Sequence, residues 1–430
     1  MPNILAKPQI SYALCDVNSF YVSCERIFRP DLAKKPVIVL SNNDGCIISM
    51  SDEAKALGIG MAVPYHQAKD IIERHQVTTF SSNYGLYGDI SNRFNAVLGD
   101  YCDLVAPYSV DESFLRFDGF QEDLTKRCLH IKQELKRSLS LPVCIGLGPT
   151  KTLAKVANHY AKKHKQSSNG VVDLHCSNQR QWILQQIPVR KIWGIGSRLA
   201  IKLNHQNIRT AWDLHNADFK VLQRIFSVNM ERMVLELRGQ ACLNFEQLPQ
   251  PKKSILNSRS FGKRITAYSD LKEALSYHAT RCSEKLRAQN SLATAITLFL
   301  YAKKNHQARS YHHHPQITVR FPAATDDTGL FVQAVEKGLR RLYQEGTYYK
   351  KAGILLTGLT DKQGHQSDLF VGLAQRPELM QSIDSINSRF GKDAVKFASL
   401  GVSANWAMRA NSFSARYTSR WQDILQITAR

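Results

Sequence analysis

Hydrophobic positions in residues 1–175 follow two different spacings. Short apolar runs end at polar or turn-forming residues, a pattern that predicts β-strands. These strands are expected at 10–16, at 37–40, at 78–80, on both sides of a tight turn within 103–117, at 142–148 and at 171–174. Apolar residues from Leu124 to Leu139 recur every three or four positions, which is typical of one face of a helix. A second helix is expected from Thr152 to Lys163, so this part of the chain is predicted to be mixed α/β.

The remainder of the chain divides at a short segment that contains two prolines and two lysines, LPQPKKS at 248–254, which reads as a linker. The pattern before it, from 177 to 245, is helical. After it, strands are expected at 258–265, 293–302, 314–321 and 352–359, with helices at about 270–289 and 330–345. The chain from 361 to 430 is polar and weakly patterned and predicts a partly ordered tail. The sequence thus indicates a multidomain α/β protein with a second compact unit.

The charge of the chain indicates a polyanionic partner. Lys and Arg number 57 against 36 Asp and Glu, which gives a net charge of +21. The excess is uneven, because residues 251–355 hold 18 basic and 7 acidic residues, whereas residues 1–175 hold 20 and 18. A surface that is basic only for solubility would spread its charge evenly, so nucleic acid is the favoured partner.

Length and composition exclude several other classes. The 430 residues are enough for two to four domains. No run approaches the roughly 20 apolar residues of a membrane span, and the first residues do not resemble a secretion signal. The nine cysteines form no CxxC pair, which argues against a disulfide framework or a zinc ribbon and favours a reducing cytoplasm.

Three carboxylates are placed where strands end. Asp16 closes an apolar strand, and Asp111 and Glu112 lie at the turn between two others. Strand ends that point into one cleft can gather carboxylates around hard cations such as Mg²⁺. From spacing alone, a solvated acidic pair at a turn is the commoner explanation.

The residues around these carboxylates carry a resemblance. CDVNSFYVSCE at 15–25, together with YSVDESF at 108–114, resembles the palm of the Y-family, or translesion, DNA polymerases, most closely the UmuC type. The similarity continues through 41–59, 81–93, 146–163, WGIGSRL at 193–199 and SRSFGKRIT at 258–266, and covers most of 10–425. It implies a right-handed polymerase fold with a ferredoxin-like palm, small fingers, a helical thumb and an α/β little finger. The expected boundaries are palm 1–30 and 81–175, fingers 31–80, thumb 176–247, linker 248–254, little finger 255–355 and C-terminal partner-binding tail 356–430.

The resemblance also implies roles for residues of the palm and fingers. Asp16, Asp111 and Glu112 become the catalytic ligands of two Mg²⁺ ions, and Tyr21 falls where the family places its steric gate against ribose. Lys55 matches a basic residue that contacts the incoming triphosphate. A second such residue is expected at Lys162, with Lys163 and Lys165 as close alternatives. Many relatives have an aromatic residue where this chain has Asp52.

Contacts with DNA are expected outside the palm. WGIGSRLAIKL at 193–203 resembles a helix-hairpin-helix, in which Gly194 and Gly196 would present backbone N–H groups to a phosphate. A plain helix cap is the alternative. In the basic unit 255–355, Arg259, Lys263 and Arg264 are expected to grip the template and primer backbones.

The tail contains a short peptide, QSDLF at 366–370, which resembles the motif that docks bacterial polymerases on the β sliding clamp. Its anchors would be Gln366, Leu369 and Phe370. A chance match is the alternative, because two of its five positions are wildcards. The UmuC-type resemblance further implies a dimer of processed UmuD and RecA as partners, primer-template DNA and dNTP as substrates, no membrane, and a cytoplasmic, nucleoid-associated location.

The sequence therefore predicts an error-prone, template-directed translesion DNA polymerase of DNA repair and the SOS response. One alternative is a metal-dependent nuclease, but a nuclease needs no steric gate such as Tyr21. Another is a non-catalytic DNA-binding repair scaffold, but three acidic residues would lower its affinity for a polyanion. GPTKT at 148–152 is not a Walker A loop, because Thr150 precedes Lys151 where glycine is needed. The histidines at 312–314 lack acidic or cysteine partners at ligand spacing and predict an exposed loop.

Overall fold

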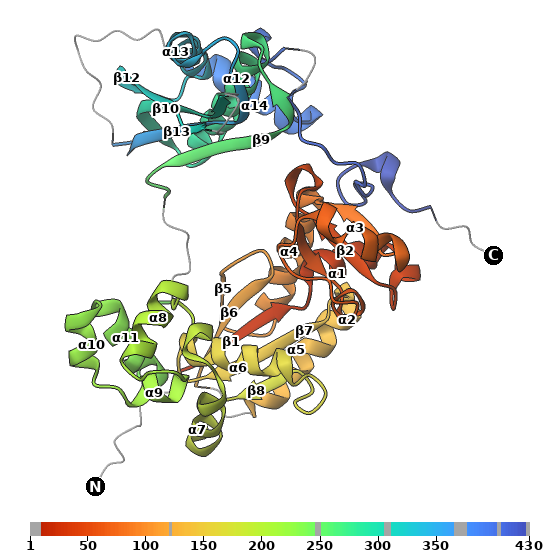
Figure 1. The fold of residues 1–430 in the computed structure, drawn as a ribbon, viewed down its shortest axis with the longest axis vertical. Helices are drawn as coiled ribbons and strands as arrows, with labels where there is room; N and C mark the ends of the chain where they lie inside the picture. Colours follow the sequence, from red (N-terminus) through yellow and green to blue (C-terminus); the bar gives the residue numbers. More distant parts are fainter. Residues whose placement is uncertain are drawn as a thin grey trace. The chain divides into compact units, whose positions relative to one another are not determined.

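The computed structural model describes residues 10–119, 123–245, 251–304, 311–364, 376–401 and 406–426. The chain forms two compact units, each drawn in Figure 1 with its own sheets and helices. Unit 1 contains residues 1–41, 46–249 and 412–430, and unit 2 contains residues 42–45 and 250–411. In the part of the chain that the structure describes, no helix is both long and apolar enough to cross a membrane.

The centre of unit 1 is a five-stranded sheet in the order β5-β6-β1-β7-β8. Its strands are β1 (Ile10–Val17), β5 (Leu104–Pro107), β6 (Glu112–Asp118), β7 (Val143–Gly148) and β8 (Val171–Asp173). The central strand β1 runs antiparallel to both β6 and β7, whereas β7 and β8 are parallel. The strands predicted in these segments are confirmed.

Helices cover both faces of this sheet. They are α1 (Phe20–Phe28), α4 (Tyr84–Gly99), α5 (Leu124–Leu139) and α6 (Lys151–Lys163). Side chains alternate along β1, so that Ala13 and Cys15 join the core formed with α1, α4 and α5, whereas Tyr12 and Leu14 pack with Ala154 of α6. The α6 face of β1 is therefore the face of its even-numbered residues.

Glycine allows α6 to lie directly on β7. A Cβ on Gly146 would collide with the backbone of Asn158 and Ala154. Thr150 caps the helix by accepting a hydrogen bond from the Leu153 amide at 3.2 Å. The segment 148–152 thus serves strand-to-helix packing.

A smaller sheet in unit 1 has the order β3-β2-β4 and its own apolar core. Its elements are β2 (Val37–Leu40), β3 (Ile47–Met50), β4 (Thr78–Ser81), α2 (Asp52–Ala56) and α3 (Tyr65–Arg74). The strands at 37–40 and 78–80 were expected, and β3 was not.

The helical pattern of 177–245 is confirmed. The helices are α7 (Ser177–Gln186), α8 (Ser197–His205), α9 (Ala211–Asn216), α10 (Phe219–Ile225) and α11 (Val228–Leu237). They share a core with the outer side of α6, to which Leu153, Val156 and Ala157 contribute. One helix therefore connects the carboxylate-bearing sheet to this helical part of unit 1.

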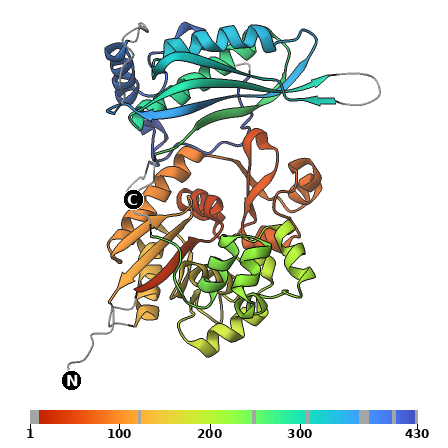
Figure 2. The ribbon, with the colours of Figure 1, turned by 90° about the vertical axis from the view of Figure 1, so that its left-hand side faces the viewer.

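Unit 2 is a second α/β unit. Its sheet has the order β11-β10-β13-β9, with β12 also paired to β10. The strands are β9 (Ile255–Ile265), β10 (Ser291–Lys304), β11 (Tyr311–His313), β12 (Gln316–Thr325) and β13 (Tyr348–Asp361). Two helices, α12 (Tyr268–Ala288) and α13 (Thr328–Leu342), pack on the same face of this sheet (Figure 2). Ile296, Leu298 and Leu300 of β10 point into the shared core.

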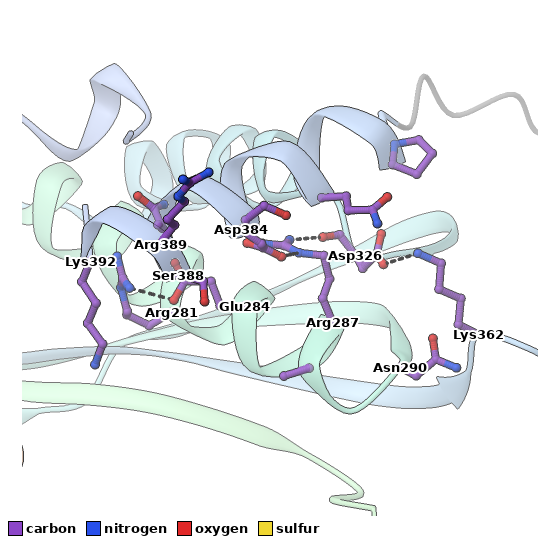
Figure 3. A pocket seen from close by; sticks show the side chains of 15 residues that line it. Arg281, Glu284, Arg287, Asn290, Asp326, Lys362, Asp384, Ser388, Arg389 and Lys392 are labelled. Atoms are coloured by element: carbon purple, nitrogen blue, oxygen red, sulfur yellow. Dashed lines mark hydrogen bonds and ion pairs between the residues drawn. The ribbon is translucent and has the colours of Figure 1, made fainter. Parts of the chain in front are cut away.

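A further helix, α14 (Pro377–Phe390), packs in unit 2 beside α12. Arg287 donates to both carboxylate oxygens of Asp384, at 2.6 and 2.7 Å, and to the backbone oxygen of Asp326 at 2.8 Å (Figure 3). Arg281 forms a second ion pair, with Asp393. Arg281, Arg287 and Asp384 line a charged cavity of about 990 Å³, and the pair of Arg287 with Asp384 ties α14 to α12.

Candidate active site

The pairing of β1 with β6 brings two of the three predicted carboxylates together. Asp16 and Glu112 are direct cross-strand partners in the antiparallel register. Because paired residues point to the same side of a sheet, both side chains lie on the α6 face, which also carries Leu14 and Phe114. Asp111 precedes Glu112 by one residue and belongs to the turn.

Helix α6 presents one lysine to each of these carboxylates. The ammonium of Lys162 lies 2.5 Å from Asp16 Oδ1, and that of Lys155 lies 2.6 Å from Glu112 Oε2. Lys155 also lies over the ring of Tyr108, 4.0 Å from its centroid. These four charged side chains line a cavity of about 150 Å³, so the site is a small and strongly polar cleft.

The two carboxyl groups have opposite electrostatic environments. Asp16 is only 2% exposed, and burial raises its pKa to about 7 although the Lys162 charge acts in the other direction. Burial alone would also raise the pKa of Glu112, but hydrogen bonds with Lys155 and Asp16 and the lysine charges hold it below its usual range. Glu112 is therefore the more acidic member of the pair, and the pKa near neutral pH belongs to Asp16.

The donor set fits divalent cations in part. Asp16 Oδ1 is buried, and within the described chain it accepts no hydrogen bond of good geometry, although Lys162 neutralises it by contact. Carboxylate oxygens of this kind are the ligands that Mg²⁺ prefers. The described residues contain no ready group of three His, Cys, Asp or Glu side chains in ligand positions. A metal ion at this site would therefore have to displace the lysines.

The third predicted carboxylate is turned toward its own loop. Asp111 Oδ1 accepts a hydrogen bond from the Ser109 hydroxyl at 2.6 Å, and its backbone oxygen accepts one from the Val17 amide at 2.9 Å. The backbone contact fixes Asp111 beside the end of β1. Of the three predicted carboxylates, the cleft is lined by Asp16 and Glu112 and not by Asp111.

Tyr21 lies in an aromatic cluster made by α1 and α4. Its ring stacks on that of Tyr87, with centroids 4.5 Å apart and planes 17° apart, and meets Tyr84 edge to face at 6.1 Å. The side chain of Tyr21 is half-buried: it packs against the edge of the core, whereas the neighbouring Phe20 lies within the core. A half-exposed ring with a fixed plane suits a wall beside a sugar.

The candidate triphosphate lysines separate into two places. Asp52 contacts the Lys55 ammonium at 2.7 Å and the Lys165 ammonium at 2.9 Å. Hydrogen bonds from these two lysines, that from Lys55 first, lower the pKa of Asp52 to about 2. The structure thus places Lys165 beside Lys55, and Lys162 at Asp16.

The two predicted glycines lie at the start of α8. Gly194 has a φ of +88°, a conformation that favours glycine, and Gly196 is the N-cap residue of α8. In the same loop, Trp193 donates to the Tyr108 hydroxyl at 3.0 Å. The loop therefore reaches the cleft through Trp193, which lines it.

The three basic residues predicted to contact DNA all lie on β9, but they have different surroundings. Lys263 and Arg264 line a cavity of about 810 Å³ in unit 2 together with Lys350 and Arg409. Arg259 instead pairs in register with the buried Ala352. Its charge, after the larger effect of burial, helps lower the pKa of His278 on α12 to about 3. The anchors of the clamp peptide, Gln366, Leu369 and Phe370, lie outside the described residues.

Sequence reasoning missed Lys155. The residue lies seven positions before Lys162, a spacing that places both on one face of a helix. Combined with the expected helix at 152–163, that spacing was the available signal. Only the register between β1 and β6 reveals which carboxylate each lysine meets.

Comparison with known proteins gives the class of the molecule. Among solved structures, a chimeric Y-family DNA polymerase built from Dbh and Dpo4 superposes with a TM-score of 0.63 at 18% identity, over 82% of this chain and 99% of that chain. DinB from Sulfolobus solfataricus gives a TM-score of 0.51 at 21% identity, over 81% and 98%. The fold is that of a Y-family polymerase.

Sequence relatives give the family. The model of the impB/mucB/samB family matches residues 15–159, that of its C-terminal domain matches 252–369, and a domain of unknown function (DUF4113) matches 377–427. The UmuC protein of Salmonella typhimurium is 40% identical over 97% of this chain and 100% of its own length. DNA polymerase IV of Moorella thermoacetica is 27% identical over 90% and 94%. The chain belongs to the impB/mucB/samB family, the UmuC type of Y-family DNA polymerases.

This membership gives the activity. The chain is a DNA-directed DNA polymerase of translesion synthesis in the damage response, and the nuclease and scaffold alternatives are not favoured. Its substrates are DNA and dNTP, and its chemistry depends on a divalent metal ion.

Proposed function

We propose that the cleft at Asp16 and Glu112 is the site of nucleotide addition, with two Mg²⁺ ions as cofactors. The observation that carries this proposal is the cross-strand pair itself, which holds two carboxylates side by side under two lysines. Asp16 and Asp111 would hold the ions, and Glu112 would support the one near the primer terminus. When bound, such ions stabilise the attacking and leaving oxygens of phosphoryl transfer.

The chain's own residues would bind and orient the substrates. Lys162, released from Asp16, lies close enough to the cleft to neutralise a bound triphosphate, and Lys55 and Lys165 would add charge to the same polyanion. The ring of Tyr21, fixed by its stack on Tyr87, would exclude a 2′-hydroxyl by its bulk. The buried Asp16 carboxyl, whose pKa is raised to about 7, would have to lose its proton before substrates assemble.

Residues of unit 1 and residues of unit 2 would each contact the sugar-phosphate backbone of DNA. The amides around Gly194 and Gly196 would contact a phosphate without reading sequence. In unit 2, Lys263 and Arg264 are the better placed of the predicted cations, because Arg259 lies on the side of β9 that faces α12. We assign residues 1–30 and 81–175 to the palm, 31–80 to the fingers, 176–247 to the thumb, 255–355 to the little finger and 356–430 to a partner-binding tail. The last boundary cuts β13, which continues to Asp361, and the tail so defined includes residues 412–430 of unit 1.

We also propose partners and a place of action. A dimer of processed UmuD, RecA and the β sliding clamp are the partners that the UmuC type implies, the last through Gln366, Leu369 and Phe370. A polymerase whose template is the chromosome acts in the cytoplasm at the nucleoid.

Primer extension tests the proposal. The purified chain is given intact and abasic templates, with Mg²⁺ or with EDTA, and with or without processed UmuD and RecA. We expect extension only with Mg²⁺, bypass of the abasic site, and stimulation by the partners. Extension that is unchanged in EDTA would refute the metal assignment, and full activity without partners would refute the dependence on them.

A further inference from the structure

The C-terminal segment of the chain packs inside unit 1 next to the aromatic cluster of Tyr21. Ser412 exchanges two hydrogen bonds with Ser81 at the end of β4, one from the Ser81 amide at 2.9 Å and one to the Ser81 hydroxyl at 3.0 Å. Phe413 forms a parallel bridge with Ser81. Residues 412–413 thus extend the edge of the small sheet.

The next residue, Ser414, is buried between α1 and α4. Its hydroxyl accepts a hydrogen bond from the Asn83 side chain at 3.0 Å and donates one to Glu25 Oε1 at 3.1 Å. Asn83 is the N-cap of α4 and accepts from the Leu86 amide at 3.2 Å. One serine therefore joins the start of α4 to the middle of α1.

Glu25 continues this chain of contacts to Tyr21. Its Oε1 also accepts a hydrogen bond from the Tyr87 hydroxyl at 2.7 Å, and the Tyr87 ring is the one on which Tyr21 stacks. Glu25 is fully buried, and within the described chain its other oxygen has no hydrogen-bond partner. Tyr87 and Ser414 both donate to the same oxygen, and a buried carboxyl with so few partners is sensitive to the loss of either.

A second contact holds the same segment to α1. The rings of Tyr417 and Phe28 stack with centroids 4.5 Å apart and planes 7° apart. The segment therefore contacts α1 at Glu25, in its middle, and at Phe28, its last residue. Tyr21 lies one helical turn before Glu25, on the same side of α1.

We propose that residues 412–417 hold the ring of Tyr21, the steric gate, in a fixed position, and we call these residues the brace. Ser414 is then a positioning residue for sugar selection. The hydroxyl of Ser414 orders Glu25, Glu25 orders Tyr87, and the Tyr87 ring fixes the plane of Tyr21. The inference rests on the proposed role of Tyr21. It assigns a function to the end of the segment that matches the domain of unknown function (377–427).

The test compares insertion of a dNTP with insertion of the matching rNTP by the full-length chain. Ser414→Ala is expected to raise the relative kcat/KM for the rNTP about three- to tenfold, the effect of one lost hydrogen bond. Tyr87→Phe, which keeps the ring and removes the hydroxyl, is expected to do the same. Ser414→Thr keeps the hydroxyl and should stay within about twofold of the wild type. Ser412→Ala is the matched control, since Ser412 bonds through its backbone, and should change nothing.

Two further measurements separate a brace from a general loss of stability. Ser414→Ala in a Tyr21→Ala background should leave the sugar ratio where Tyr21→Ala alone puts it, because the brace acts through that ring. If Tyr21→Ala alone leaves the ratio unchanged, the gate assignment is wrong and the brace falls with it. If Tyr21→Ala relaxes selection but Ser414→Ala and Tyr87→Phe do not, the brace alone is overturned. A fall in melting temperature with an unchanged ratio also overturns it.

Discussion

Asp16 and Glu112 face each other across neighbouring strands, and each is neutralised by a different lysine of the same helix. The two lysines offset the negative charge that the two carboxyl groups bring into one small cleft. Each carboxylate that could bind a metal ion is already paired with a lysine, and that lysine would compete with the ion. The lysines, not the carboxylates alone, should therefore set how the site responds to pH and to Mg²⁺.

The buried Asp16 carboxyl should lower the stability of the metal-free protein at alkaline pH. Its folded-state pKa of about 7 lies above the usual value of 3.8, so its stabilising contribution is complete below about pH 4 and is lost as the pH rises through 7. Asp16→Asn removes this dependence. In EDTA, its melting temperature should exceed that of the wild type by at least about 2 °C at pH 8, with a smaller difference at pH 5. A difference that shrinks from pH 5 to pH 8 would contradict the assignment.

Lys155 should compete with Mg²⁺ for Glu112. Removal of its ammonium by Lys155→Met should lower the Mg²⁺ concentration for half-maximal insertion about three- to tenfold, the effect of one charged contact. Lys136→Met, at an exposed lysine of α5, is the matched control. A Mg²⁺ titration of primer extension checks this. An unchanged Mg²⁺ concentration for half-maximal insertion would show that Lys155 does not compete with Mg²⁺ for Glu112.

Asp52 should weaken the binding of the incoming nucleotide. It holds Lys55 and Lys165, which the triphosphate would need. Because these are exposed ion pairs, Asp52→Ala should lower KM for dNTP only about two- to fivefold and leave kcat unchanged. Asp70→Ala, an exposed carboxylate of α3, is the control. Steady-state insertion kinetics decide the matter, and a higher KM would mean that Asp52 orients the lysines for the nucleotide.

The clamp peptide gives a prediction that is independent of the cleft. Leu369→Ala with Phe370→Ala should abolish stimulation by the β clamp, since buried apolar side chains contribute roughly 1.5–3 kcal/mol each to docking. Ser367→Ala with Asp368→Ala should leave the stimulation intact. Both variants should extend a primer normally without clamp. Full stimulation of the Leu369 and Phe370 variant would make QSDLF a chance match.

The sequence predicted the elements better than the contacts between them. Short apolar runs placed β1 and β6, and a three-to-four-residue periodicity placed α5, because these segments are buried in the core; the family motifs placed Asp16 and Glu112. The sequence could not give the register between β1 and β6, and this register decides that Lys155 meets Glu112. β3 was missed because IISM is a short run with only a weak alternating pattern.

The C-terminal part of the chain, from 361 to 430, was the hardest to predict, because its order depends on distant partners. Ser414 meets Glu25 and Asn83, which both lie near the opposite end of the sequence. Helix α14 is mostly polar and buries little beyond Met380, and its ion pair with α12, between Asp384 and Arg287, has no periodic signature. A polar segment that is ordered by hydrogen bonds leaves no hydrophobic pattern to read.

The most direct test of the account is single-turnover insertion of one dNTP by Asp16→Asn, alongside the affinity for primer-template DNA. The account predicts that insertion falls at least about 10³-fold, or ~4 kcal/mol of transition-state stabilisation, while the DNA dissociation constant stays within about twofold of the wild type. Asp111→Asn should behave alike if its side chain turns from Ser109 to join the pair. Insertion by Asp16→Asn within tenfold of the wild type would contradict the assignment of this cleft as the active site.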